Sequence, residues 1–175
     1  MRISARADYA VRAVIELACV ALPAVEVPAG AGGWTKAERI AAAQAIPLPF
    51  LVNIFKSLRA AGLVEAKRGA DGGYRLALAP ADISVAAVVR AVDGPLASVA
   101  GALVEDLEYT GRAVALRETW VALRCSIRGV LESISLADLA AQQLPAVVTE
   151  LLCDEDAFTT RPQARERFQR RVDPA

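Results

Sequence analysis

Residues 48–78 read LPFLVNIFKSLRAAGLVEAKRGADGGYRLAL, and this stretch decides the fold. Its first half predicts a helix over 48–61, because apolar side chains recur at the spacing of one helical face. Gly62 follows at a position where a left-handed residue can end a helix. Its second half contains two alternating runs around a glycine-rich turn, which predicts a β-hairpin. The buried side chains of the helix are expected to be Leu51, Ile54, Phe55 and Leu58.

The turn RGADGGYRL at 68–76 fits two interpretations, a phosphate-binding loop of an enzyme or the tip of a hairpin that approaches DNA. A Walker-type loop requires the pattern G-x-x-x-x-G-K-[S/T] between a strand and a helix. That pattern is missing here, and the turn leads into a second strand-like run. We therefore interpret the glycines as a hairpin turn, with Arg68 and Gly69 at a tip that can reach phosphate or a narrow groove.

The segment before this stretch predicts a shorter helix over 36–43 and a tight turn over 44–47. Thr35-Lys36-Ala37-Glu38 matches a capping box, in which the Thr35 and Glu38 side chains bond to backbone amides at the helix start. A short helix, a turn and a second helix with a polar, basic face form a helix-turn-helix. A basic face on a single helix is more often merely solvated, and the hairpin that follows favours DNA binding. The face consists of Pro49, Phe50, Asn53, Lys56 and Arg59.

A first helix is expected from Ala5 to Ala21, with Ser4 as its cap and apolar stripes on two sides. The proline- and glycine-rich segment 23–34 predicts a flexible connection to the next helix. With the hairpin, these helices predict a winged helix-turn-helix DNA-binding domain over residues 1–95.

The chain after the hairpin predicts further helices. Ser84 is expected to cap a helix that ends at Asp93-Gly94-Pro95, whereas 96–111 fits either a loop or a short helix. A long helix is predicted over about 112–133, with a coiled-coil-like apolar seam that favours pairing with a second copy of the chain. The dimer contacts are expected at Leu116, Trp120, Leu123 and Ile127.

Two further regions complete the expected organisation. Residues 96–144 contain a linker, the long dimerisation helix and a short helix opened by a capping pattern at Ser135 and Asp138. Residues 145–175 form a C-terminal extension with an Arg-rich tail, RPQARERFQRRVDPA. The expected fold class is therefore mainly α, with a small β-hairpin wing and a long dimerisation helix.

The composition favours packed helices and argues against most catalytic sites. Hydrophobic residues make up 55% of the 175 residues, but aromatic residues only 5%. The chain contains no histidine, which removes the commonest general base and zinc ligand. Cys19, Cys125 and Cys153 lie far apart in the sequence, which disfavours a disulfide framework or a zinc site. We therefore expect no enzymatic activity and no metal site.

The charges are distributed unevenly, although the net charge is zero. Residues 1–95 carry a net charge of +3, residues 96–160 of −6 and residues 161–175 of +3. A basic front is compatible with a polyanionic partner such as DNA. The sequence contains no apolar run long enough to cross a bilayer and no signal-peptide pattern, so we expect a cytoplasmic protein without membrane contact.

Three stretches resemble the Rrf2 family of bacterial winged-helix transcription regulators. They read MRISARADYAVRAVIELA at 1–18, IPLPFLVNIFKSLRAAGLVEAKRGADGGYRLA at 46–77 and ISVAAVVRAVDGPL at 83–96. The resemblance implies a homodimer that grips palindromic double-stranded DNA with its recognition helices and wings. The DNA contacts that it implies are Ser4, Arg6, Tyr9, Pro49, Phe50, Asn53, Lys56, Arg59, Arg68 and Gly69.

The resemblance also bears on sensing, because some members of the family hold an iron–sulfur cluster on three cysteines. Residues 93–124 contain no cysteine here, and the position of the third ligand corresponds to Val114. Iron–sulfur clusters need thiolate ligands, so we expect no cofactor and a resemblance to the non-cluster members. Their signals include small molecules, partner proteins and thiol oxidation, and the sequence does not choose among them.

The sequence thus favours a dimeric DNA-binding transcription regulator, with a repressor as the expected form. The alternative is a winged-helix interaction module that has lost DNA binding and acts through its acidic middle. The basic character of Asn53, Lys56, Arg59 and Arg68 as a set favours DNA.

Overall fold

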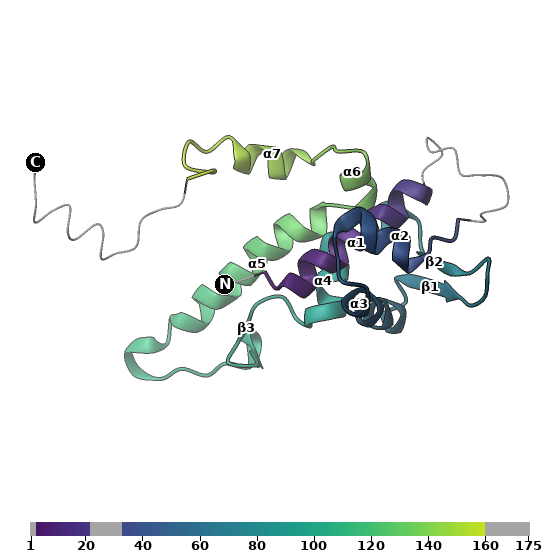
Figure 1. The fold of residues 1–175 in the computed structure, drawn as a ribbon. Helices are drawn as coiled ribbons and strands as arrows, with labels where there is room; N and C mark the ends of the chain where they lie inside the picture. The colour runs from purple at the N-terminus through teal and green to yellow at the C-terminus, as the bar shows by residue number, and fades with distance from the viewer. Residues whose placement is uncertain (1–2, 22–32, 160–175) are drawn as a thin grey trace, which may run out of the picture. The chain divides into compact units, whose positions relative to one another are not determined.

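The computed structural model describes residues 3–21 and 33–159 and divides the chain into two compact units, Met1–Leu144 and Pro145–Ala175 (Figure 1). The flexible connection expected over 23–34 lies almost wholly outside the described residues, and the Arg-rich tail, 161–175, lies wholly outside them. The second unit contains α7 (Ala146–Leu152). The elements of the first unit are α1 (Ala5–Ala21), α2 (Ala37–Gln44), α3 (Leu48–Ala60), β1 (Val64–Lys67), β2 (Gly73–Leu76), α4 (Val85–Asp93), β3 (Ser98–Val99), β4 (Ala102–Leu103), α5 (Leu116–Ser133) and α6 (Leu136–Ala140), with 3-10 turns at Pro80–Asp82, Val104–Asp106 and Gly111–Ala113.

Three helices, α1, α4 and α6, begin where a serine side chain accepts from a free backbone amide of the first turn. The backbone N–H of Ala7 donates to Ser4 Oγ at 2.9 Å at the start of α1, as the sequence predicts. Ser84 caps α4 in the same way, and Ser135 forms a complete capping box with Asp138 at α6. Gly62 ends α3 with a φ of +72°, which confirms the predicted left-handed position.

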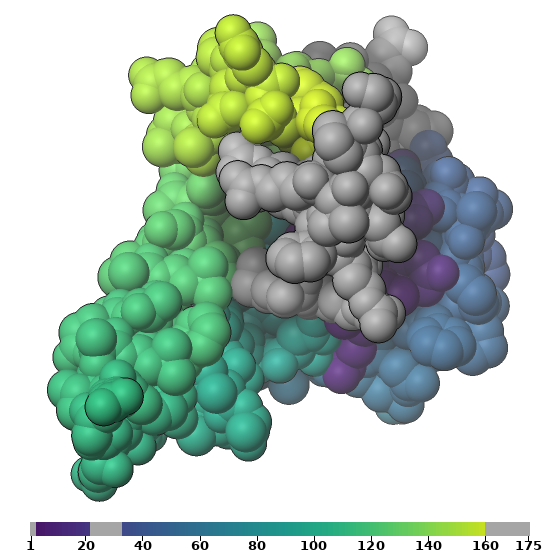
Figure 2. All heavy atoms as spheres, turned by 90° about the vertical axis from the view of Figure 1, so that its left-hand side faces the viewer, coloured from purple at the N-terminus to yellow at the C-terminus, as the bar shows by residue number. Residues whose placement is uncertain are grey.

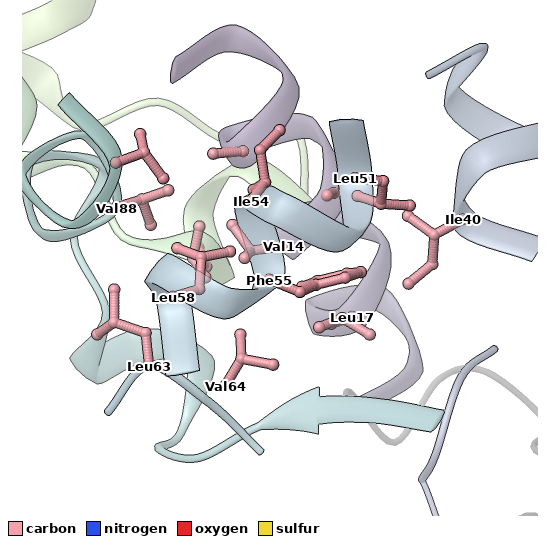
Figure 3. Close-up of a cluster of buried hydrophobic side chains, with 14 of the residues drawn as sticks. Val14, Leu17, Ile40, Leu51, Ile54, Phe55, Leu58, Leu63, Val64 and Val88 are labelled. Atoms are coloured by element: carbon pink, nitrogen blue, oxygen red, sulfur yellow. The ribbon is translucent and has the colours of Figure 1, made fainter. Parts of the chain in front are cut away.

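The core lies between α1, α2, α3 and α4 (Figure 3). The four residues predicted for the inner face of α3, Leu51 to Leu58, are all buried, with exposed fractions of 1% or less. They pack with side chains of the neighbouring helices, among them Val14, Ile40 and Val88. Burial of each such side chain stabilises the fold by about 1.5–3 kcal/mol, so this cluster fixes how the recognition helix α3 is held.

The hairpin is the predicted wing, and a third segment joins it. β1 pairs antiparallel with β2, from Val64 opposite Leu76 to Lys67 opposite Gly73. Thr35 pairs with Tyr74 through two backbone hydrogen bonds of 2.9 and 2.8 Å. The Tyr74 ring in turn stacks on Phe55 of α3, with ring centroids 4.0 Å apart. The wing is therefore attached to the rest of the domain along the edge of β2 and through the Tyr74 ring.

The capping box predicted at Thr35 is wrong. The helix begins at Ala37, the residue before it is Lys36, and no side chain caps its first amides. Thr35 is 5% exposed and its backbone belongs to the sheet. The reason is that two backbone hydrogen bonds with Tyr74 hold Thr35 in an extended strand pairing. Thr35 therefore lies one residue before Lys36, which occupies the cap position of the helix.

Gly73→Ala is expected to destabilise the protein by about 1–3 kcal/mol. A Cβ at Gly73 would lie 2.5 Å from the carbonyl oxygen of Thr35, so the Thr35 backbone would have to move away from the wing. Urea unfolding of the parent and the variant measures the difference. The control is Gly129→Ala, because Gly129 lies in α5 with open space around it and alanine favours a helix by about 1 kcal/mol. Equal stability of parent and Gly73→Ala would contradict the close packing of this wing.

The segment 96–111, for which the sequence fits either a loop or a short helix, forms a small second hairpin and turns. β3 and β4 are strands of two residues each, and a 3-10 turn at Gly111–Ala113 precedes α5, so α5 begins at Leu116 rather than near 112. Figure 1 shows the C-terminal part of α5 beside α4, and Figure 2 shows its first turns and the segment before them, in green at the lower left, projecting away from α2 and α3. No residue of α5 is fully buried.

Among the described residues, no single helix is long and apolar enough to cross a membrane. The consecutive helices α2 and α3 satisfy that test only together, and they are bent by 117° at the break between them.

Candidate nucleic-acid interface

The exposed face of α3 carries the side chains that the sequence assigns to recognition. Pro49, Asn53, Lys56 and Arg59 are exposed, and Phe50 is 61% exposed although it is a large apolar residue. Lys56 Nζ donates to Asn53 Oδ1 at 3.3 Å. The opposite face of the same helix is buried, so α3 presents this surface outward on a fixed support.

The start of α1 brings one further cation to α3. The Arg6 guanidinium donates to Ser57 Oγ at 2.7 Å, and Arg6 itself is exposed. The structure therefore places Arg6 beside the recognition helix, although Arg6 and Ser57 lie 51 positions apart in the sequence.

Ser4 and Tyr9, the other predicted contacts of this helix, are engaged within the protein. The Ser4 hydroxyl donates to Asp93 Oδ2 at 2.5 Å and accepts from the Ala7 amide. Tyr9 is half-buried against the core, and the Arg12 guanidinium lies 5.6 Å from the centre of its ring. These contacts fix the orientation of α1 relative to α4 and the core.

The wing tip presents a second group of cations. Lys67, Arg68 and Gly69 are exposed, and Lys36 Nζ donates to the Gly69 carbonyl at 3.2 Å. The acid Asp71 is exposed in the same turn. Sequence reasoning missed Lys36, because its place at the tip depends on the pairing of Thr35 with Tyr74 and no local pattern indicates it.

The other arginine of the wing, Arg75, is exposed but engaged in contacts within the protein. It forms an ion pair with Glu65 at 2.7 Å, and its guanidinium lies over the Trp34 ring at 4.5 Å from the centroid. In the part of the chain that the structure describes, Arg68 forms no ion pair, so it is the wing arginine available to a polyanion.

The surface formed by α3, the wing tip and Arg6 can bind a polyanion, and we call it the basic surface. Its cations release counterions when they neutralise phosphates, which favours binding without reading sequence. Asn53 lies among them on the helix and can donate to and accept from a base edge. The cations of the basic surface are Arg6, Lys36, Lys56, Arg59, Lys67 and Arg68.

The cysteines do not offer a cluster site. Cys19 is in α1, Cys125 on α5 and Cys153 at the end of α7, and the described residues contain no group of three or more His, Cys, Asp or Glu side chains that could hold a metal. Burial, with the charge of Glu16, raises the pKa of the Cys19 thiol. A raised pKa lowers the thiolate fraction that metal binding requires. This donor set does not fit an iron–sulfur cluster.

Comparison with known proteins gives one family and a consistent set of relatives. The family model described as "Rrf2: Iron-dependent Transcriptional regulator" matches residues 3–142. The chain is 47% identical, over 88% of its length and 90% of the relative, to Rv1287 of Mycobacterium tuberculosis strain H37Rv, whose name describes a transcriptional regulator of the helix-turn-helix type. It is 33% identical to the helix-turn-helix regulator CymR of Bacillus subtilis, over 81% of this chain and 91% of CymR.

Solved structures give the same result. The structure of CymR, the global cysteine regulator of B. subtilis, matches with a TM-score of 0.64 and 30% identity, over 82% of this chain and 98% of that one. The structure of T. potens IscR matches with a TM-score of 0.59 and 29% identity, over 85% of this chain and 96% of that one. The mainly helical winged fold predicted from the sequence is confirmed.

Proposed function

The chain belongs to the Rrf2 family of helix-turn-helix transcriptional regulators, and from this membership we propose that it is a homodimeric repressor that binds a palindromic DNA site and works without an iron–sulfur cluster. The observation that carries the proposal is the basic surface, in which two segments distant in the sequence add cations to the recognition helix and the wing. As a regulator of the chromosome it acts in the cytoplasm, and its activity is binding rather than catalysis.

Within this proposal the residues of the basic surface divide by role. Asn53 reads a base edge in the major groove, while Pro49 and Phe50 contact the groove wall with their apolar surfaces. Lys56, Arg59 and Arg6 bind the phosphates that flank the recognition helix, and Arg68 and Gly69 bring the wing to an adjacent minor groove or its phosphates. Ser4 and Tyr9 lie at the start of α1, where the family resemblance places DNA contacts, and their contacts within the protein orient that helix.

The apolar surface of α5 supports the homodimer. Leu116, Trp120 and Ile127 are half-buried and Leu123 is 40% exposed, so the seam is incompletely covered by its own chain. A largely apolar groove of about 520 Å³ opens between α1, α4 and α5, and Ile3 at its edge is 73% exposed. A second copy of α5 would cover both surfaces. Two copies of the basic surface related by a two-fold axis would match a palindromic site.

The single experiment that tests the function is selection of genomic DNA fragments by the purified protein. We expect an enriched motif with two-fold symmetry, and addition of the protein to a transcription reaction from an enriched promoter should lower transcript yield. Recovery of fragments without a common motif would contradict sequence-specific binding and would favour a winged-helix interaction module.

The protein isolated without oxygen is expected to be colourless, and added iron should leave its DNA affinity unchanged. The physical reason is the lack of cysteine in residues 93–124, with Val114 at the third ligand position. Visible absorption spectroscopy and iron analysis of the anaerobic protein measure the first part, and a DNA titration with and without ferrous iron measures the second. A brown protein with iron–sulfur absorbance would overturn the cluster-free assignment.

A further inference from the structure

A second cavity, apart from the basic surface, lies between α4, α5 and the segment 94–105. Its volume is about 410 Å³, within the range of small-molecule sites. Three arginines line it, Arg90 from α4 and Arg124 and Arg128 from α5. These arginines come from two helices that meet at one cavity, and we call this group the arginine pocket.

Neighbouring acids neutralise the arginine pocket only in part. Glu132 Oε1 accepts from both Arg90 and Arg128, and Glu105 pairs with Arg124. The hydrogen bond from Arg90 and the charge of Arg128 hold the pKa of Glu132 below its usual value, so this acid is ionised at neutral pH. Three lining arginines face these two anions, and Arg117, which donates to the Glu105 carbonyl, adds a fourth cation nearby. The group therefore keeps a net positive charge for an anionic ligand.

One donor in the arginine pocket is left without a partner. Arg124 Nε is buried and, among the described residues, has no hydrogen-bond acceptor. A buried unsatisfied donor costs about 1–3 kcal/mol, and more when the group is charged. Arg124 also lines the cavity, and a guanidinium presents its N–H groups in a geometry that suits a carboxylate.

The cavity also has apolar lining residues. They are Pro95, Leu96, Ala97 and Leu103, of which Leu96 is 7% exposed and Leu103 38% exposed. A ligand that fits both the arginines and these apolar residues therefore has one anionic end and an apolar body. A carboxylate offers two coplanar oxygens to a guanidinium, and its chain can lie on the apolar residues, which inorganic phosphate cannot use.

We propose that the arginine pocket binds a small organic carboxylate with an apolar chain. The carboxylate contacts Arg124 and Arg128, and the chain lies on Leu96 and Leu103. This site goes beyond the proposed function, because it depends on α4, α5 and the 94–105 segment and on no residue of the basic surface. Since the cavity joins α4 to α5, its occupation changes how the DNA-binding domain is held against the helix that we assign to the dimer.

The test is calorimetric titration of the full chain, without DNA, with acetate, hexanoate, octanoate, octylamine and inorganic phosphate at constant ionic strength. We expect affinity to rise about fourfold for each methylene that is buried, in line with the free energy of burying a methylene. Octanoate should bind more tightly than inorganic phosphate, and octylamine, with the same chain and the opposite charge, should bind at least about tenfold more weakly.

Variants separate this pocket from other apolar surfaces. Arg124→Gln and Arg128→Gln are each expected to weaken octanoate binding at least about tenfold, whereas Arg39→Gln, the same charge change on the exposed face of α2, should leave it unchanged. Arg128 is 48% exposed, so its replacement keeps the fold even if loss of Arg124 does not, and thermal unfolding checks both. Equal octanoate affinity in the parent and Arg128→Gln, tighter binding of phosphate, or no binding at millimolar octanoate would overturn the proposal. Because this titration uses no DNA, failure of the arginine-pocket proposal would leave the test of DNA binding unaffected.

Discussion

Replacement of Trp120 by glutamate is expected to convert the proposed homodimer into a monomer or an insoluble chain. The seam of α5 would then bury an uncompensated charge, which costs about 3–5 kcal/mol and raises the dimer dissociation constant by a factor of about 100 or more. Trp120 is half-buried, and its indole N–H donates to the Tyr109 hydroxyl at 3.2 Å, so this variant also disturbs its own chain. Light scattering at micromolar concentration measures the mass of parent and variant.

A second variant isolates the dimer contact from the fold. Leu123 is 40% exposed in the single chain, so Leu123→Glu should cost the monomer little and still abolish the dimer. The control is Ala122→Glu, which adds the same charge to an exposed position one residue away, on a different face of α5. A parent that scatters as a stable monomer would remove the dimer and, with it, the expected palindrome.

Two substitutions on the basic surface are expected to reduce DNA binding in different ways. Asn53→Ala should relax preference at one base position of the selected site and cost about 1–3 kcal/mol there, because a paired base edge loses its partner. Arg68→Ala should weaken binding to all sequences and lower the slope of log K against log salt by about one unit, because one phosphate contact and its counterion release are lost.

Salt titrations by fluorescence anisotropy on the selected site and on scrambled DNA separate these outcomes. Arg112→Ala is the control for charge, because Arg112 is exposed in the 3-10 turn before α5 and lies outside the basic surface. If Asn53→Ala and Arg68→Ala both bind the selected site like the parent, the basic surface is not the DNA interface. A dimer that survives that result would support the interaction module instead.

Local patterns in the sequence were sufficient for most of the DNA-binding fold. The spacing of Leu51 to Leu58 predicted the buried face of α3, and Gly62 predicted where that helix ends. Ser4 and Ser84 predicted the starts of α1 and α4. Each of these predictions depends on contacts between residues no more than about five positions apart, or on one repeating face, and such contacts follow from helix geometry alone.

Positions set by pairing between distant segments were decided only by the tertiary structure. Thr35 matched a capping box, but its backbone pairs with Tyr74, which moves the start of α2 and brings Lys36 to the wing tip. The arginine pocket arises in the same way, since Arg90 and Glu132 meet across 42 positions of the chain. A local motif predicts only contacts between residues that are close in the sequence. A backbone group that pairs with a distant strand is positioned by the packing of the whole chain, which a local motif does not contain.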